Sequence, residues 1–266
     1  MLIDYAEFCG HDFAGALDRT HDSVMPFGES NARSESEDNP HALTRAQSSS
    51  EWFDVYAAPS ATFDARRDVP MALMTDDGRR VMRKRRGEVH RDGDWHRSAH
   101  VWIVDCERDV VVAQRRSPAK DTFPGMWDIS AAGHVNSSET DSRMTALGEL
   151  AEELGVVIDG ERLGAKQFTC PARQHELGGC NCYEDVYFLA WDIATEGEEF
   201  AIGRAEVTAT KWVAIDDLER ALESGDPEYV PRVPAYRAAF FPSLRAFVAA
   251  RRRAHPGVGI ADDRTS

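Results

Sequence analysis

The chain has 266 residues, of which 42% are hydrophobic and 29% are charged, so it suits a globular protein with a sizeable core. Its 31 basic and 46 acidic side chains give a formal net charge of −15. An acidic protein repels phosphate backbones and anionic lipid, which argues against general nucleic-acid or membrane-surface binding. A small phosphorylated substrate is not excluded, provided that some local feature reverses the field.

Cysteine usage and the N-terminal residues favour a cytoplasmic protein. The cysteines are five, an odd number that does not suggest a disulfide framework. The first residues, MLIDYAEFCGHDF, lack the basic and apolar regions of a signal peptide. No apolar run approaches the roughly 18 residues that would span a bilayer. Nothing in the sequence indicates an oligomeric state.

Residues 1–50 differ from the rest of the chain. They hold nine acidic residues and three arginines and end in a polar, Ser-rich stretch. Such a segment buries too little apolar surface to offset the entropy of ordering, so we expect a disordered tail, with a short helix near Tyr5–Leu17 left open. The sequence predicts one folded domain over residues 51–255 and a frayed tail over 256–266.

The folded part begins with two short predicted strands, Glu51–Tyr56 and Ala72–Met74. Six basic side chains then crowd into the segment Arg79–Arg86. This segment is interpreted either as a charged hairpin edge protected from aggregation or as a patch that receives phosphate.

The remaining elements mix strands and helices without regular alternation. The predicted strands are His100–Val104, Val110–Gln114, Trp127–Ala132, Glu184–Trp191 and Ala209–Ile215. The predicted helices are Thr140–Leu154, ended by Gly155, then Asp216–Ser224 and Arg237–Arg253. This order predicts an α+β fold, in which a mixed sheet is flanked by helices.

An acidic helix face is the most informative feature of the sequence. On the helix predicted over Thr140–Leu154, the apolar residues Met144, Leu147, Leu150, Ala151 and Leu154 fall on one side. Glu149, Glu152 and Glu153 fall on the other at i, i+3 and i+4 spacing, where like charges repel. A divalent cation would turn that repulsion into binding, and oxygen ligands suit Mg²⁺ or Mn²⁺. Glu139, just before the helix, is a fourth candidate carboxylate.

The segment Gly133–Val156, GHVNSSETDSRMTALGELAEELGV, resembles the Nudix box, G-x5-E-x7-R-E-U-x-E-E-x-G-U with U apolar. The matching residues are Gly133, Glu139, Glu149, Leu150, Glu152, Glu153, Gly155 and Val156. Two departures stand out. Eight residues separate Glu139 from the usual arginine position, one more than in the pattern, and that position holds Gly148. The resemblance implies a Nudix-type α/β/α sandwich.

Segments outside the box resemble the branch of Nudix proteins that is similar to isopentenyl-diphosphate isomerases. They are DWHRSAHVWIVD, QRRSPAKDTFPGMWDISAAGH, EDVYFLAW and KWVAIDDL. The resemblance implies that Arg116 and Lys120 grip a substrate diphosphate, as two cations on one loop would suit. True isomerases place a cysteine where this chain has Ala132 and tend to place an arginine at Glu149, so the resemblance favours a hydrolase.

The same resemblance suggests a second metal site, because His134 falls at an isomerase metal-ligand position, with His100 and Glu184 as further candidates. In Nudix hydrolases a metal-activated water attacks phosphorus. We assign Glu149, Glu152 and Glu153, with Glu139, to Mg²⁺ or Mn²⁺. The general base is left open among Glu152, Glu153 and Glu206, with Glu184 as a further candidate.

The segment from Cys170 to Cys182 contains several residues that could bind zinc. Its candidate ligands are Cys170, His175, Cys180 and Cys182. C-x9-C-x-C lacks the paired spacing of common zinc sites, so we expect free thiols there.

Three functional hypotheses follow from the sequence. The first is a divalent-metal-dependent hydrolase of a small organic or nucleoside diphosphate. The second is an isomerase of prenyl diphosphates, which Ala132 opposes. The third is a catalytically impaired ligand sensor, suggested by Gly148 and the extra residue in the box.

Overall fold

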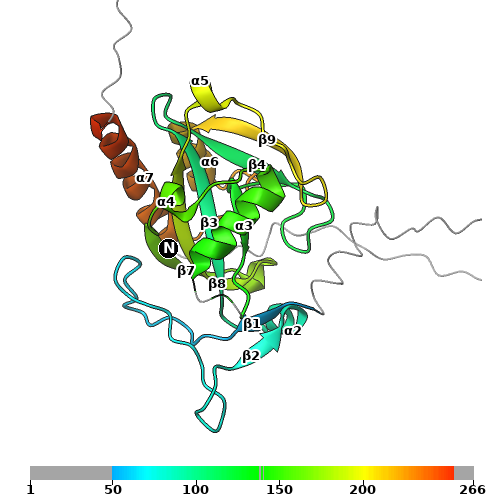
Figure 1. Ribbon diagram of the computed structural model, residues 1–266. Helices are drawn as coiled ribbons and strands as arrows, with labels where there is room; N and C mark the ends of the chain where they lie inside the picture. The colour runs from blue at the N-terminus through cyan, green and yellow to red at the C-terminus, as the bar shows by residue number, and fades with distance from the viewer. Residues whose placement is uncertain (1–49, 138, 140, 255–266) are drawn as a thin grey trace, which may run out of the picture. The chain divides into compact units, whose positions relative to one another are not determined.

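A computed structural model describes residues 50–137, 139 and 141–254. The expectations for residues 1–49 and 255–266, including the Tyr5–Leu17 helix, lie outside this range. A mixed sheet forms the centre (Figure 1). Its strands are β3 (His96–Asp105), β4 (Val110–Arg116), β5 (Trp127–Asp128), β6 (Ala131–His134), β7 (Phe168–Arg173), β8 (Asn181–Ala190) and β9 (Val207–Ala214).

Strand β3 organises the sheet because it pairs with three others. It runs parallel to β8 over its length, from His96 opposite Cys182 to Val104 opposite Ala190. On its other side, β3 pairs antiparallel with β6 near its start and with β4 only at its end. Strand β9 adds to β4, and β7 adds to β8. The β3 edge is therefore shared between β6 and β4, which places the two strands close to each other beside β3.

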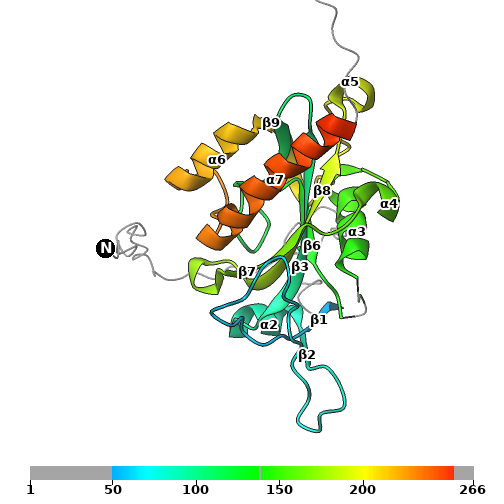
Figure 2. The ribbon, with the colours of Figure 1, turned by 90° about the vertical axis from the view of Figure 1, so that its left-hand side faces the viewer.

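Helices cover both faces of the sheet, which confirms the predicted fold class of a mixed sheet flanked by helices (Figure 2). Helices α3 (Ser142–Leu154) and α4 (Gly160–Leu163) pack on one face, against Val101, Ile103 and their neighbours. Helices α6 (Ile215–Ser224) and α7 (Pro234–Ala254) pack on the other, against Trp102 and Val104. Because side chains alternate along β3, one strand contributes to both cores.

The segment before β3 forms a small substructure of its own. Strands β1 (Trp52–Asp54) and β2 (Arg83–Arg85) pair antiparallel, and α2 (Arg86–Asp92) follows directly. The helix α2 was not predicted, and the strand expected at Ala72–Met74 is reduced to isolated bridges at its two ends. Short turns complete the described chain, namely the 3-10 turn His175–Leu177 and α5 (Ile193–Glu196).

Helix α3 is the element that the box sequence predicts, and it begins and ends almost where expected. Asp141 caps its first turn by accepting a hydrogen bond from the Arg143 N–H, and the chain leaves the helix at Gly155. The predicted apolar face is wrong in one position, because Met144 is 57% exposed. Glu153 is instead 1% exposed, so a carboxylate is buried at the edge of the core.

Candidate active site and metal centres

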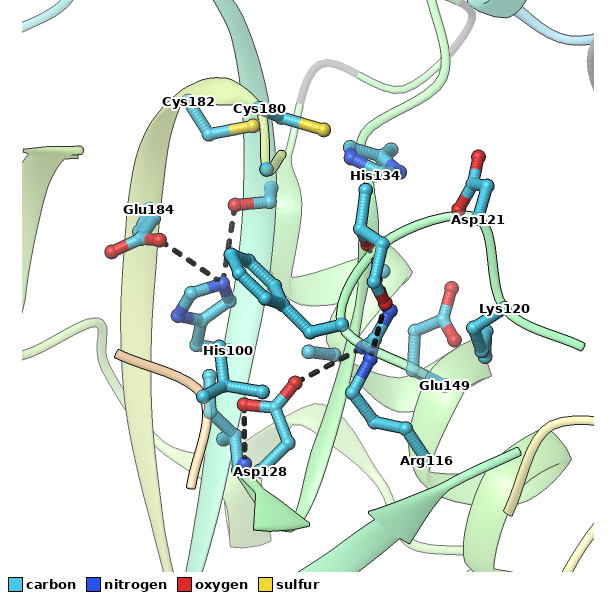
Figure 3. A pocket seen from close by; sticks show the side chains of 18 of the residues that line it. His100, Arg116, Lys120, Asp121, Asp128, His134, Glu149, Cys180, Cys182 and Glu184 are labelled. Atoms are coloured by element: carbon cyan, nitrogen blue, oxygen red, sulfur yellow. Dashed lines mark hydrogen bonds and ion pairs between the residues drawn. The ribbon is translucent and has the colours of Figure 1, made fainter. Parts of the chain in front are cut away.

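A cavity of about 290 Å³ opens beside β3 and β6. Many separate stretches of the chain contribute side chains to its wall, and Figure 3 labels ten of these side chains. The stretches include strand β3, the loop after β4, strand β6, helix α3, the start of β8, the loop before β9 and the segment that precedes α7. This size is at the lower end of the range for small-molecule sites. The wall is mainly polar and charged, and three groups of side chains have members in it.

The first group consists of three carboxylates. Ligand oxygens of Glu149, Glu153 and Glu206 all lie within 4.8 Å of one another. Glu149 and Glu153 are one turn apart on α3, while Glu206 comes from the loop before β9. That loop is held against α3 at Gly203, whose N–H donates to the Glu153 carbonyl over 2.9 Å. A Cβ on Gly203 would lie 2.2 Å from the Glu152 carbonyl oxygen, so only glycine permits this approach.

The carboxylate of Glu153 is fixed by two hydrogen bonds to one of its oxygens. Gln114 donates from its side-chain amide over 2.8 Å, and the Ala132 N–H donates over 2.9 Å. Burial raises the pKa of Glu153, although Lys120 nearby opposes the increase. Burial likewise raises the pKa of Glu149 well above its usual range, with repulsion from Glu153 and Glu206 adding to it. Burial and repulsion between the carboxylates therefore make it costly for all three to be ionised at once.

Two further glutamates from the sequence prediction lie elsewhere. Glu152 is exposed on α3 and lines the cavity, but it is not part of the group of three. Glu139 lies between β6 and α3, where its N–H donates to the Asn136 carbonyl over 2.9 Å. It neither lines the cavity nor joins the described carboxylate group.

Arg116 and Lys120 both line the cavity, and both are engaged by the protein itself. Arg116 donates to the Asp128 carboxylate over 3.0 Å and to the backbone and hydroxyl oxygens of Thr122. Lys120 pairs with Glu206, and its ammonium lies 3.5 Å from Glu153. Lys120 therefore occupies a position among the carboxylates that a metal cation would also favour.

The second group combines three histidines and one cysteine. Ligand atoms of His90, His96, His134 and Cys180 lie within 4.8 Å of one another. They come from α2, the start of β3, the end of β6 and the residue before β8. The Nδ1–H of His96 donates to the Asp94 carbonyl over 3.0 Å, so in the neutral ring Nε2 carries the lone pair. The Nε2 atom of His90 is buried without a hydrogen-bond partner.

Electrostatics in this second group favour a thiolate among the imidazoles. Hydrogen bonding from Cys182, followed by that from the three histidines, holds the pKa of the Cys180 thiol well below its usual range. Burial lowers the pKa of His134 to about 3. Burial opposes protonation of His90 as well, but Asp121 and Cys180 raise its pKa to about 9. Three imidazoles and a thiolate form a donor set typical of zinc.

The third group lies where β3 and β8 run side by side. His100 and Glu184 face each other, with 3.8 Å between Nε2 and the nearer carboxylate oxygen. Arg232, 7% exposed, pairs with Asp128 and lies 3.7 Å from Glu184. Burial raises the pKa of Glu184 to about 8 and lowers the pKa of His100 well below its usual range.

The structure thus separates the three residues suggested for a second metal site. His134 lies with His90, His96 and Cys180, whereas His100 and Glu184 belong to the third group. The sequence patterns did not reveal His90 and His96, because His90 lies on an unpredicted helix and no closely spaced pair of cysteines accompanies their H-x5-H spacing. Cys180 was considered for zinc together with Cys170, His175 and Cys182, whereas the structure groups it with His90, His96 and His134.

Three of the six basic side chains in the Arg79–Arg86 segment pair with acidic side chains. Arg83 pairs with Asp54, and Lys84 pairs with Asp92 and Asp94. Arg86 is the member that lines the cavity, and it pairs with Glu51 over 3.0 Å. Because these charges are matched by nearby acids, the segment is not one uninterrupted positive patch.

Comparison with known proteins identifies the family. The NUDIX domain family matches residues 94–233, which run from β3 to the segment before α7. This range includes every member of the three groups except His90. The chain therefore belongs to the Nudix family, and the curated relatives that it matches include proteins named Nudix hydrolases.

Individual relatives agree with this assignment. The chain is 37% identical to Nudix hydrolase 3 of Arabidopsis thaliana over 60% of its own length and 21% of that protein. It is 32% identical to an uncharacterized Nudix hydrolase of Clostridium acetobutylicum over 57% of its own length and 73% of the relative. A more distant relative, the isopentenyl-diphosphate Delta-isomerase of Halorhodospira halophila, is 26% identical over 60% of this chain and 89% of the relative. The chain thus spans about a fifth of the Arabidopsis protein.

Within residues 50–137, 139 and 141–254, no helix is both long enough and apolar enough to cross a membrane.

Proposed function

We propose that the protein hydrolyses a diphosphate linkage in a small organic or nucleoside diphosphate with the help of Mg²⁺ or Mn²⁺. The observation that carries this proposal is the convergence of Glu149, Glu153 and Glu206. The first and last of these glutamates line the cavity together with Lys120 and Arg116. Carboxylates recruit the metal, and cations on the same wall attract the diphosphate.

The carboxylate group fits a divalent cation. Glu149 and Glu153 have raised pKa values because of burial and mutual repulsion, which is the cost that a cation would remove. Their donors are oxygens, which suit Mg²⁺ and Mn²⁺. When bound, such an ion neutralises charge on the diphosphate and promotes ionisation of water.

Each protein side chain then has a separate task. Glu149 and Glu153 hold the metal, with Gln114 and the Ala132 N–H fixing the direction of Glu153. Lys120 exchanges its carboxylate partners for the diphosphate. Arg116, bound to Asp128 and Thr122, keeps the loop that carries Lys120 in place.

The proton released from water needs an acceptor at the carboxylate group. As water adds to one phosphorus, the bridging P–O bond breaks and the water proton passes to a glutamate. We assign this role to Glu206, because it lies with Glu149 and Glu153 but belongs to a different loop. Glu152, exposed at the cavity wall, is the alternative acceptor, while Glu153 is already committed to two hydrogen bonds.

The two competing functions receive less support. An isomerase needs a proton donor such as a thiol near Ala132, whereas this position offers a methyl group and a backbone N–H engaged by Glu153. An impaired sensor was suggested by Gly148, where the box normally has arginine. The orientation of Glu153 by Gln114 and Ala132 supports an active enzyme despite that change.

We also propose that His90, His96, His134 and Cys180 form a second metal centre that takes Zn²⁺. The carbonyl of Asp94 and the carboxylate of Asp121 lie next to ring nitrogens of two of these histidines, over 3.0 and 3.6 Å. Such outer contacts typically orient histidine ligands. This centre replaces the combination of His134 with His100 and Glu184 considered from the sequence.

Turnover of a diphosphate panel tests the main proposal. The purified full chain should release phosphate or a monophosphate with Mg²⁺ or Mn²⁺, and a chelator should abolish the release. Glu149→Gln and Glu153→Gln should lower kcat by about 100-fold or more. Glu161→Gln, an exposed substitution on α4, is the matched control. If wild type and both site variants are equally inert across the panel, the hydrolase proposal is wrong.

Two additional readouts separate the alternatives. Interconversion of isopentenyl and dimethylallyl diphosphate would support an isomerase. Metal analysis of the purified chain should give about one zinc per chain, and Cys180→Ser should remove most of it and lower Tm. Zinc content unchanged by Cys180→Ser would contradict the second centre.

A further inference from the structure

Asp121 follows Lys120 on the loop after β4, and both side chains line the cavity. One carboxylate oxygen of Asp121 lies 3.5 Å from Nη2 of Arg86 and 3.6 Å from Nδ1 of His90. Both partners belong to α2, and their side chains are mostly buried, so water screens these contacts less than it screens surface ion pairs. Asp121 therefore joins the loop that carries Lys120 to α2.

Helix α2 lies before residue 94, where the match to the NUDIX domain begins, yet it is held firmly against the domain. At its start, the Arg86 N–H donates to the Glu51 carbonyl over 2.9 Å, and the two side chains pair over 3.0 Å. At its end, the side-chain amide of Asn181 donates to the Gly93 carbonyl over 2.8 Å. Because both ends are tied down, α2 can serve as a fixed anchor for the loop.

The loop has further anchors at its two ends. The Ser117 N–H donates to a carbonyl of the loop before β9 over 2.8 Å. Arg116 donates to the carbonyl and the hydroxyl of Thr122. Between these ends, Asp121 adds a contact to a separate element, directly beside Lys120 in the chain. The backbone at Lys120 is therefore held by α2 as well as by the ends of the loop.

The position of the Lys120 ammonium affects two ligands of the proposed site. It pairs with Glu206 and lies 3.5 Å from Glu153, so it competes with a divalent cation for these carboxylates. It is also a cation that the diphosphate is proposed to meet in the cavity. A firmly held loop keeps both effects at full strength, whereas a looser loop weakens both.

We propose that Asp121 is a positioning residue, which holds Lys120 at the carboxylate group by joining its loop to α2. The active site then includes a helix that precedes the match to the NUDIX domain. The inference rests on the proposed function for the contact between Lys120 and the diphosphate, but its effect on Mg²⁺ binding needs no substrate. Because Asp121 acts through Lys120, a substitution of Asp121 should matter only while the lysine is present.

Calorimetric titration of the purified full chain with Mg²⁺ tests this in two backgrounds, wild type and Lys120→Met. In wild type, Asp121→Ala should tighten Mg²⁺ binding at least about threefold, because a loosely held lysine competes less well. In Lys120→Met, the same substitution should change the affinity by less than about 1.5-fold. A direct electrostatic effect has the opposite sign, since loss of a nearby negative charge weakens cation binding.

Asp92→Ala is the matched control. Asp92 is an acidic residue at the end of α2 that pairs with Lys84 and does not line the cavity. Its substitution should leave Mg²⁺ binding unchanged in both backgrounds. With a diphosphate that wild type hydrolyses, Asp121→Ala should raise KM about threefold and keep kcat within about twofold. General damage to the fold would instead lower kcat and Tm together.

The outcomes separate this inference from the hydrolase proposal. Mg²⁺ binding that Asp121→Ala leaves unchanged, weakens, or shifts equally in both backgrounds overturns the positioning role. An unchanged KM in a protein that hydrolyses the diphosphate overturns it as well and leaves the hydrolase in place. A diphosphate panel without turnover contradicts the hydrolase, while the Mg²⁺ titration still decides the role of Asp121. Absence of Mg²⁺ binding in wild type would overturn both proposals.

Discussion

Replacing Gly133 by alanine should disable the carboxylate group while leaving the fold intact. A Cβ at this position would lie 1.7 Å from Oε1 of Glu149 and 2.1 Å from its Cδ. Ordinary contacts between such atoms are about 3.5 Å, so the overlap is severe. Because the end of the Glu149 side chain can rotate and β6 is held in the sheet, the carboxylate gives way and moves by about 2 Å.

That displacement sets the expected loss of activity. A misplacement of about 1 Å in a catalytic group can cost roughly 100-fold in rate, which is about 2.7 kcal/mol in activation free energy. We therefore expect kcat of Gly133→Ala to fall by at least about 100-fold and its Mg²⁺ requirement to rise. The free energy of unfolding should change by less than about 1 kcal/mol, because the clash is relieved by the side chain alone.

Gly148→Ala is the matched control for this substitution. A Cβ at Gly148 meets nothing within 4 Å, and the residue lies inside α3. Alanine there should stabilise the protein by about 0.5–1 kcal/mol and leave kcat unchanged. The assay is phosphate release over a Mg²⁺ titration, with urea unfolding in parallel. If Gly133→Ala keeps more than a third of wild-type kcat, Glu149 does not act from the position described.

Three further predictions concern the surroundings of the site. Gln114→Ala should weaken Mg²⁺ binding by about tenfold, since the Glu153 carboxylate loses a donor at 2.8 Å. Calorimetry should show no such effect for Gln167→Ala, because the half-buried Gln167 side chain bonds only to the Ala165 carbonyl. Lys120→Met should tighten Mg²⁺ binding several-fold, because the metal no longer competes with the lysine ammonium for the carboxylates. It should also raise KM for the diphosphate by about tenfold, because the substrate loses a cationic partner. Unchanged metal binding would contradict the position of Lys120 beside Glu206. Asp185→Asn should lower the free energy of unfolding by about 3 kcal/mol at neutral pH, since Arg97 and Lys166 lose a fully buried partner. Although burial opposes it, Arg97 and Lys166 hold the pKa of Asp185 below its usual range, so this contribution is complete above the unfolded pKa of about 3.9 and disappears as the pH falls through the lower folded value. Urea unfolding of the two proteins should therefore converge in acid, and a constant difference down to pH 2 would refute the assignment.

Local sequence patterns were sufficient for the elements that carry the box. Helix α3 forms where the spacing of leucines predicts it, and Gly155 ends it. The hairpin between β3 and β4 follows from two β-branched runs separated by a short polar turn. The same patterns did not reveal that Glu153 is buried and Met144 exposed, because the orientation of a helix depends on the surface against which it packs.

The group of His90, His96, His134 and Cys180 shows why some candidate sites escape local patterns. Its members belong to four segments, and only His90 and His96 have a spacing that zinc motifs use. The parallel pairing of β3 with β8 brings His96 level with Cys182, and the antiparallel pairing of β3 with β6 brings His134 to Ser98. Strand pairing over such distances in the sequence depends on the whole fold.

By itself, the amino-acid sequence determined the α+β class and the glutamates of α3, because helical periodicity and strand propensity act over neighbouring residues. Tertiary structure decided which carboxylates meet: Glu206 joins Glu149 and Glu153, whereas Glu139 and Glu152 do not. Tertiary structure also decided that this strongly negative chain has a cavity in which Lys120 lies between acidic side chains. Charge on a sequence can be counted, but its field depends on where folding places each side chain.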